Sequence, residues 1–319
     1  MQIDFANLKI QHNLYKEEIE EAILKVARDC NFIMGSQIDE LERNLEKFTG
    51  SKYAISCSSG TDALLLAMMA LDIQPDDEII TTPFTFFATA ETIAFLKAKP
   101  VFVDIDEKTY NIDPKKIEEK ISSKTKAIIP VSLYGQPCDM DEINQIAKKY
   151  NLKVIVDGAQ SFGSTYKGIS DSNLGDISCT SFFPAKPLGC YGDGGALFTN
   201  DEKLADKIKS LRLHGQSIRY HHQYIGMGGR LDTIQAAVLN VKLKYYPKDL
   251  KLRQDVAEKY TKALNEKNIE TPFVKNDRTS AWAQYSIRVQ NRTELQTKLQ
   301  NLGIPTAVHY PMPVHVQEC

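Results

Sequence analysis

Two side chains near the middle of the chain, Asp157 and Lys186, have surroundings that suit cofactor chemistry. Asp157 ends the apolar, β-branched run VIVD and is followed by Gly158 and Ala159, a pattern typical of a buried strand with a functional group at its carboxyl end. Lys186 lies between the turn SFFPAK and the glycine-rich stretch GDGG. A lysine amine can form a Schiff base with a carbonyl cofactor, and an aspartate can keep a pyridinium nitrogen protonated. Taken singly, each would be an ordinary strand-end acid or loop lysine.

A turn of small residues, SSGTD over 58–62, follows a short strand predicted over 53–58. It leads into the apolar run ALLLAMMAL, which is predicted to be helical. A helix N-terminus reached through such a turn presents free N–H groups to an anion, and the Thr61 hydroxyl could add a donor. An N-cap that only satisfies the helix backbone is the simpler interpretation of this turn by itself.

Predicted strands alternate with predicted helices at the spacing of βαβ units, so we expect a largely parallel sheet. Ligands of such sheets gather at the carboxyl ends of the strands. Several candidate residues follow strands directly and are therefore expected to converge; they are Gly60, Thr61, Phe86, Asp157 and Gln160. The strands are predicted over 53–58, 78–83, 101–106, 127–135 and 154–157.

The remaining segments surround this sheet. Residues 1–15 are expected to form an extended arm and the polar segment 214–230 a loop, while Pro247 is expected to end a helix. We expect a large domain over 1–245 that includes the arm, and a smaller C-terminal domain over 246–319. Further helices are predicted over 15–29, 38–48, 63–71, 114–121, 139–150, 201–213, 231–245, 250–265 and 293–302, and C-terminal strands over 283–289 and 306–310.

The composition of the chain argues against several kinds of binding partner and site. The 39 basic and 41 acidic residues give a net charge of −2, which argues against a nucleic-acid partner. None of the six cysteines forms a Cys-x-x-Cys pair, so reduced thiols are expected. The adjacent His221 and His222 are unsuited to hold a metal together, and no metal site is expected. There is no apolar leader and no apolar run near the ~18 residues of a membrane helix, so a cytoplasmic protein without a membrane partner is expected.

Six segments, in this order and spacing, resemble the DegT-type nucleotide-sugar aminotransferases. They are SGTDAL, TFFATAE, DGAQSFG, SFFPAKPLGCYGDGGALFTN, RLDTIQAA and AVHYPMPVH. The resemblance covers nearly all of the chain. It implies an α/β fold of the aspartate-aminotransferase-like, fold type I group, with a mostly parallel central sheet flanked by helices and a smaller C-terminal α/β domain.

The resemblance also implies pyridoxal 5'-phosphate (PLP) as cofactor and a role for each matching residue. Lys186 matches the lysine that forms the Schiff base, and Asp157 matches the acid paired with the pyridine nitrogen. Gln160 matches the residue that binds the ring hydroxyl, and Phe86 the aromatic on the ring face. The phosphate site matches Gly60, Thr61 and Ser181, and the substrate site matches Arg230, His309 and Tyr310.

The reaction implied is a two-step transamination. An amino acid, L-glutamate in most of the family, leaves its amino group on the cofactor, and Lys186 moves the proton between Cα and the cofactor. The 3-keto group of a UDP-linked sugar then accepts the amine. Arg230 favours a sugar with a carboxylate, because its guanidinium fork can bond both oxygens, although a salt bridge elsewhere would also explain it. The family builds each active site from two subunits, which implies a homodimer.

The chain departs from the family at two places. The family usually carries Asn two residues before the Arg of Arg-Leu-Asp, where this chain has Gly228. Relatives also continue beyond the position of Cys319, so we expect the small domain to be truncated. Two other functions compete with transamination. A dehydratase of the same family would have His in place of Lys186, and a regulatory protein that binds PLP without turnover would keep the same fold and pocket.

Overall fold

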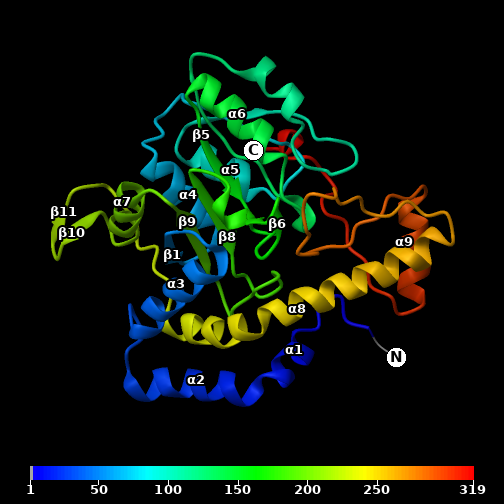
Figure 1. The fold of residues 1–319 in the computed structure, drawn as a ribbon, viewed down its shortest axis with the longest axis horizontal. Helices are drawn as coiled ribbons and strands as arrows, with labels where there is room; N and C mark the ends of the chain where they lie inside the picture. The colour runs from blue at the N-terminus through cyan, green and yellow to red at the C-terminus, as the bar shows by residue number, and fades with distance from the viewer. Residues whose placement is uncertain (1–2) are drawn as a thin grey trace.

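A seven-stranded sheet lies at the centre of the computed structural model, which describes residues 3–319, and helices cover both faces of the sheet (Figure 1). The strand order is β1-β9-β8-β5-β4-β2-β3. Strands β8, β5, β4, β2 and β3 pair in parallel, while β9 runs antiparallel to both of its neighbours. The largely parallel sheet predicted from the sequence is therefore confirmed. The strands are β1 (Tyr53–Cys57), β2 (Glu78–Thr81), β3 (Lys99–Phe102), β4 (Thr125–Ile128), β5 (Lys153–Asp157), β8 (Ile177–Ser181) and β9 (Gly195–Thr199).

Most predicted helices are present within a few residues of their expected bounds. The exceptions include 114–121, which forms two short 3-10 turns, Pro114–Lys116 and Glu118–Lys120. None of the helices in the described part of the chain is long and apolar enough to cross a membrane. The helices are α1 (Leu8–Leu14), α2 (Lys16–Asp29), α3 (Ser36–Thr49), α4 (Gly60–Ala70), α5 (Ala88–Phe95), α6 (Met140–Tyr150), α7 (Glu202–Arg212), α8 (Thr233–Asn265) and α9 (Arg292–Asn301).

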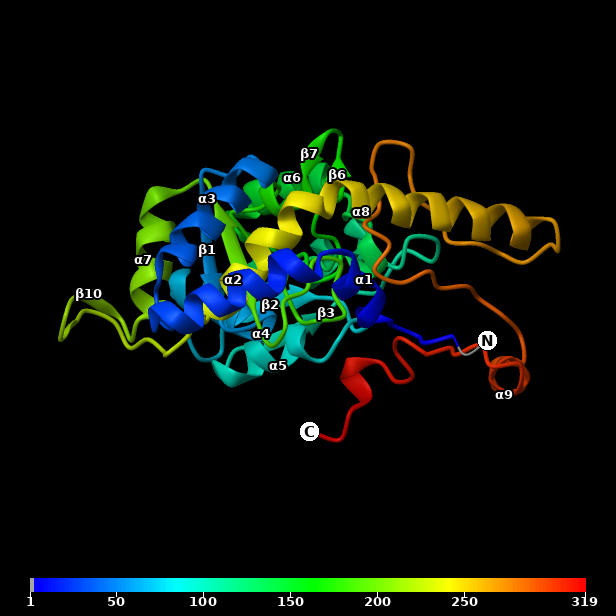
Figure 2. The ribbon, with the colours of Figure 1, turned by 90° about the horizontal axis from the view of Figure 1, so that it is seen from below.

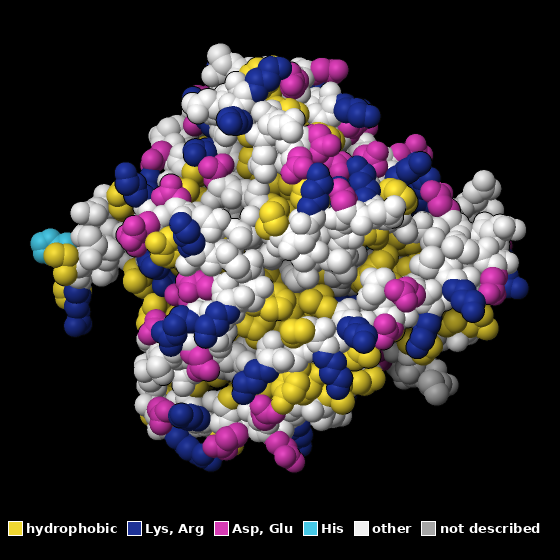
Figure 3. Space-filling model, in the orientation of Figure 1, with side chains coloured by type: hydrophobic (Ala, Val, Ile, Leu, Met, Phe, Trp, Pro, Cys, Tyr) yellow, Lys and Arg dark blue, Asp and Glu magenta, His cyan; other side chains and the backbone are white. Residues whose placement is uncertain are grey.

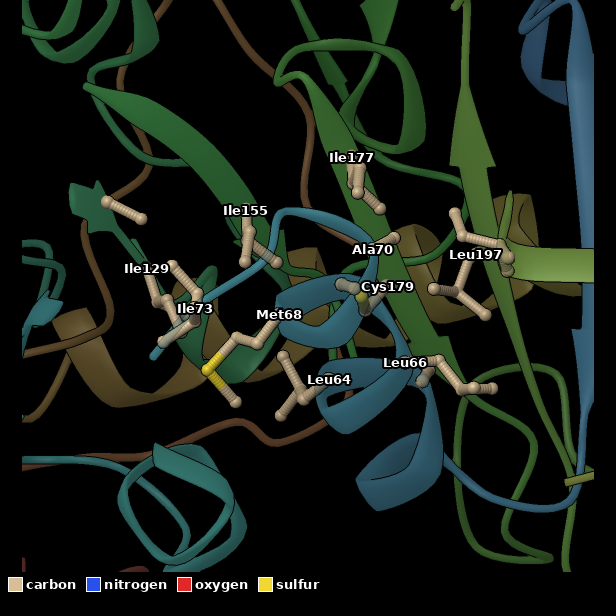
Figure 4. Packing of buried hydrophobic residues seen from close by; sticks show 14 of the residues in the cluster. Leu64, Leu66, Met68, Ala70, Ile73, Ile129, Ile155, Ile177, Cys179 and Leu197 are labelled. Atoms are coloured by element: carbon tan, nitrogen blue, oxygen red, sulfur yellow. The ribbon is translucent and has the colours of Figure 1, made fainter. Parts of the chain in front are cut away.

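Strand β5 is buried on both faces, and its alternate side chains enter different cores. Ile155 packs with residues of α4 such as Met68, on the face shown in Figure 4. Val154 and Val156 point to the opposite face, where they pack with Ile143 of α6. Because both faces are filled, the strand end at which the candidate carboxylate lies has little freedom to move.

The prediction that Pro247 ends a helix is wrong, because α8 runs unbroken from Thr233 to Asn265 with Pro247 inside it. An interior proline removes one hydrogen bond and crowds the preceding turn, at a cost of about 3 kcal/mol. Packing on both sides of the proline offsets this cost. Leu243 and Tyr246 are buried in the core under α3, and Leu250 packs against the same core.

Two segments expected to lack regular structure are partly ordered into elements. The arm predicted over 1–15 contains helix α1, which begins after Asn7, whose side chain accepts a hydrogen bond from the Ile10 N–H at 3.2 Å; residues 1–2 lie outside the described residues. The loop predicted over 214–230 contains a hairpin of β10 (Gln216–Ile218) and β11 (His221–His222), which projects from the body (Figures 1 and 2).

The C-terminal strands predicted over 283–289 and 306–310 are wrong, since neither segment pairs into a sheet. Strands need a hydrogen-bonded neighbour. Here Ala281 and Ala283 instead donate their N–H groups to the carbonyls of Gly135 and Tyr134, at 2.9 and 3.0 Å. The strand predicted over 101–106 is also displaced, because β3 ends at Phe102.

Substitution of Tyr246 by Phe tests the packing that holds α8 together. The Tyr246 hydroxyl donates to the Phe162 carbonyl inside the core. Its removal leaves that carbonyl without its partner, so the free energy of unfolding should fall by roughly 1–3 kcal/mol in a urea titration. Tyr245→Phe is the matched control, since among residues 3–319 the Tyr245 hydroxyl donates to Glu18 alone, and Glu18 is exposed. Equal losses for the two variants would contradict the interpretation.

Candidate active site

The carboxyl ends of β1, β2, β5 and β8 lie along one edge of the sheet, because these strands run in the same direction. The segments that follow them form the candidate site, as parallel sheets commonly arrange. These segments are the start of α4, the turn before α5, the turn after Asp157, and the loop over 182–194 that carries Lys186.

Asp157 lies at this edge with its carboxylate buried, 6% of the residue being exposed. The Thr89 hydroxyl donates to Oδ2 at 2.8 Å and the Ala159 N–H donates to Oδ1 at 3.2 Å. Burial raises the pKa of Asp157, while the two hydrogen bonds and the positive charge of Lys186 act in the opposite direction. The carboxylate is thus held in one orientation and is short of positive partners.

Lys186 faces Asp157 from the loop between β8 and β9. The backbone N–H of Lys186 donates to the Phe183 carbonyl at 2.8 Å, which closes a turn around the lysine. Burial lowers the pKa of the Lys186 amine, and the nearby Asp157 carboxylate partly restores it. A lowered pKa leaves more of the amine neutral near pH 7, and the neutral amine is the form that attacks a carbonyl group.

Four further predicted residues meet beside this pair. The Gln160 amide accepts from the Tyr134 N–H at 2.6 Å and donates to the Tyr310 hydroxyl at 3.1 Å, which leaves one of its N–H bonds free. Phe86 and Tyr310 lie with ring centroids 6.1 Å apart. Burial and the charge of Lys186 lower the pKa of His309, and burial raises the pKa of Tyr310 to about 12.

The predicted phosphate residues also lie together. A Cβ on Gly60 would come within 2.6 Å of the Ser181 Cβ, so the first turn of α4 touches the end of β8. The backbone N–H groups of Gly60 and Thr61 donate to no other atom in residues 3–319. Ser59 caps the helix by accepting from the Asp62 N–H. The turn therefore serves as an N-cap and still leaves free donors at this edge.

Arg230 forms no direct polar contact with the other predicted substrate residues in the part of the chain that the structure describes. Its side chain forms no hydrogen bond or ion pair with any residue that the structure describes, including His309 and Tyr310. The segment before it lies against the β1–α4 turn, where the Ser58 N–H donates to the Gly229 carbonyl at 3.1 Å. Gly228 is exposed, and a side chain there would meet the His214 ring at 3.2 Å.

Sequence reasoning missed two residues of the site, Thr89 and Tyr134. Thr89 is a buried hydroxyl in the first turn of α5, just after the turn that carries Phe86, and its place at the start of a helix that follows a strand could have revealed it. Tyr134 has a positive φ of 60° and links Gln160 to the carbonyl of His309. A tyrosine in the left-handed region has no sequence signature.

Comparison with known proteins agrees with this geometry. The family profile of the DegT/DnrJ/EryC1/StrS aminotransferases matches residues 13–319. The chain belongs to this family. It is 52% identical to the UDP-2-acetamido-2-deoxy-3-oxo-D-glucuronate aminotransferase of Pseudomonas aeruginosa, over 99% of this chain and 88% of that protein. It is also 44% identical to a pleiotropic regulatory protein of Geobacillus stearothermophilus, over 99% and 86% of the two chains.

Comparison with solved structures agrees with the comparison of sequences. NtdA from Bacillus subtilis, solved with its bound cofactor PMP, superposes with a TM-score of 0.93 at 33% identity, over 100% of this chain and 74% of that one. The fold is the α/β fold of the fold type I PLP enzymes, as the sequence predicts, and the protein is a PLP-dependent aminotransferase. The residues present fit the cofactor, since a buried carboxylate, a half-buried lysine whose amine has a lowered pKa, and free N–H donors lie at one edge of the sheet.

The reactivity of Lys186 in cofactor-free protein tests the electrostatics of the pair. Because burial lowers its pKa, Lys186 should undergo reductive methylation by formaldehyde at a lower pH than the exposed Lys251. Asp157→Asn removes the charge that raises the pKa of Lys186, so this variant should react at a still lower pH. Peptide mass spectrometry across a pH series measures both. Parallel profiles for the two lysines, unchanged by Asp157→Asn, would overturn the assignment.

Proposed function

We propose that the protein transfers the amino group of L-glutamate to the 3-keto group of a UDP-linked sugar, UDP-2-acetamido-2-deoxy-3-oxo-glucuronate. The observation that carries the proposal is the pairing of the buried Asp157 with the half-buried Lys186, with His309 and Tyr310 beside them. The identity of 52% to an aminotransferase named for this sugar supports the substrate. Such an amino sugar would enter bacterial surface polysaccharide, the O-antigen of lipopolysaccharide, and the reaction would take place in the cytoplasm.

Each residue at the sheet edge has a part in holding PLP in this proposal. Lys186 would hold it covalently, Asp157 would pair with the ring nitrogen, and Gln160 would bond the ring hydroxyl. Phe86 would pack on the ring. The free N–H groups of Gly60 and Thr61, together with Ser181, bind the phosphate at the N-terminus of α4. Bound there, PLP supplies an electron sink that makes the adjacent C–H bond acidic.

Side chains of the protein then remove and return the proton of this C–H bond. The Lys186 Nζ takes the proton from the amino acid Cα and returns it during the opposite half-reaction, and the lowered pKa of its amine favours the neutral form that this step needs. The Tyr310 hydroxyl stays protonated, since its pKa is about 12, and can donate to a sugar oxygen. The lowered pKa of His309 favours an uncharged ring that can donate or accept.

The sugar carboxylate would be bound by Arg230 of a second copy of the chain, in a homodimer with shared active sites. Within residues 3–319 Arg230 forms no hydrogen bond with His309 or Tyr310, and in this proposal a neighbouring copy supplies it. The exposed apolar side chains near it support this arrangement, because soluble monomers rarely leave large apolar patches uncovered. Ile218, Tyr220 and Ile225 are 69%, 76% and 93% exposed. The β10–β11 hairpin, which carries Ile218 and Tyr220, projects from the body at the left of Figure 3.

The proposal also divides the chain into a large cofactor-binding unit over 1–245 and a smaller unit over 246–319. Helix α8 crosses the boundary between them without a break. The two units therefore share one element, and the division falls within a helix instead of within a linker.

The half-reaction with L-glutamate distinguishes an aminotransferase from a regulatory protein that binds PLP without turnover. The absorbance of the bound cofactor should change when L-glutamate is added to the holoprotein, and a keto sugar should reverse the change. Lys186→Ala should bind PLP and show neither response. A panel of UDP-linked 3-keto and 4-keto sugars, with and without a carboxylate, identifies the acceptor. An unresponsive holoprotein would favour the regulator, and a preference for uncharged sugars would refute the uronate.

Mixing two inactive variants tests whether active sites are shared. In a heterodimer of Lys186→Ala and Arg230→Ala chains, one site regains both wild-type residues if Arg230 serves its neighbour. Refolding the two in equal amounts should therefore restore about a quarter of wild-type activity at low sugar concentration, given random pairing in a twofold dimer. Each variant alone is the control. No recovery, with dimers confirmed by light scattering, would place Arg230 in its own chain's site.

A further inference from the structure

A second buried lysine, Lys242 of α8, lies behind the loop that carries Lys186. Only 3% of Lys242 is exposed, and it forms no ion pair with any carboxylate in residues 3–319. Its Nζ donates instead to the Gly189 carbonyl, three residues after Lys186. Burying an amine costs free energy unless the amine is hydrogen-bonded, and an apolar side chain would fill the same volume at lower cost.

The backbone of the loop over 182–194 is closely packed around Gly189, which restricts the position of this residue. The Cys190 N–H donates to the Phe182 carbonyl at 2.7 Å, which folds the segment back on itself. A Cβ at Gly189 would collide with the carbonyl oxygens of Phe183 and Pro184. Only glycine fits at position 189 of this closed segment, and its carbonyl accepts from Lys242.

Helix α8 holds the loop at a second point. The Gln235 amide oxygen accepts from the Tyr191 N–H at 2.8 Å. Gln235 and Lys242 are seven residues apart, two helical turns, and therefore lie on one face of α8. The Tyr191 ring covers the amine of Lys242, with 5.6 Å between Nζ and the ring centroid. Burial lowers the pKa of Lys242 to about 8, and the amine has hydrogens to donate in either protonation state.

We propose that Lys242 is a positioning residue for Lys186. With Gln235 it anchors residues 189–191, so that the loop presents the Lys186 amine to Asp157 in one geometry. It acts through the loop and touches neither cofactor nor substrate. This inference rests on the role proposed above for Lys186.

The test compares Lys242→Met, which fills the space without a donor, with Lys251→Met, an exposed position on the same helix. PLP is added to cofactor-free protein, the adduct is trapped with borohydride at timed intervals, and labelling of Lys186 is followed by peptide mass spectrometry. Labelling in Lys242→Met should be roughly ten- to a hundred-fold slower, because small misplacements of a reacting group have effects of this size. The kcat should fall in parallel while the KM values for glutamate and sugar stay within about two-fold. Lys251→Met should match wild type.

Gln235→Leu, at a half-buried position, breaks the other anchor and should show the same division between kcat and KM. It covers the case in which Lys242→Met does not fold. Wild-type labelling rates in whichever of the two variants fold would overturn the inference, as would a rise in KM equal to the fall in kcat. If wild-type protein is itself not labelled at Lys186, the proposed function fails first, which distinguishes the two failures.

Discussion

The structure depends on keeping a carboxylate and an amine, Asp157 and Lys186, near each other in a place that disfavours both charges. Burial raises the pKa of the acid and lowers that of the lysine, while each charge favours the other. A buried charge that loses its partner costs several kcal/mol, so the pair tolerates little movement. The double-sided core around β5, the Thr89 hydroxyl and the closed loop over 182–194 all restrict that movement.

Close backbone approach is the second constraint at the same edge. The start of α4 touches both β8 and β9, where a Cβ on Gly60 or Gly195 would overlap Ser181 or Ser59. Glycine is needed at these positions for space and not for an unusual backbone angle. Moving these strands apart to admit side chains would separate the free N–H groups of Gly60 and Thr61 from Ser181, and so disperse the predicted anion site.

Prediction from the sequence was correct for elements whose local residue pattern reflects their own role in the sheet. The apolar strand ending in Asp157 and the alternation of strands with helices predicted the largely parallel sheet correctly. Prediction failed where distant packing decides the outcome. Pro247 has a local preference for ending a helix, and only the burial of Tyr246 and Leu243 overrides it. The left-handed backbone of Tyr134 and the lack of strand pairing over 283–289 likewise depend on partners that lie far away in the sequence.

The unbroken course of α8 connects the two sides of the site. Near its start Gln235 and Lys242 hold the Lys186 loop, and farther along the Arg253 guanidinium donates to the Trp282 carbonyl at 3.1 Å. The Trp282 indole returns a hydrogen bond to Gln254 at 2.6 Å, which fixes the start of the segment that leads on to His309. A break at Pro247 would uncouple these contacts. The packing that offsets the cost of Pro247 therefore holds the Lys186 amine and the substrate residues in fixed relative positions. This is a functional reason for α8 to continue past a proline at which the sequence alone predicts an end.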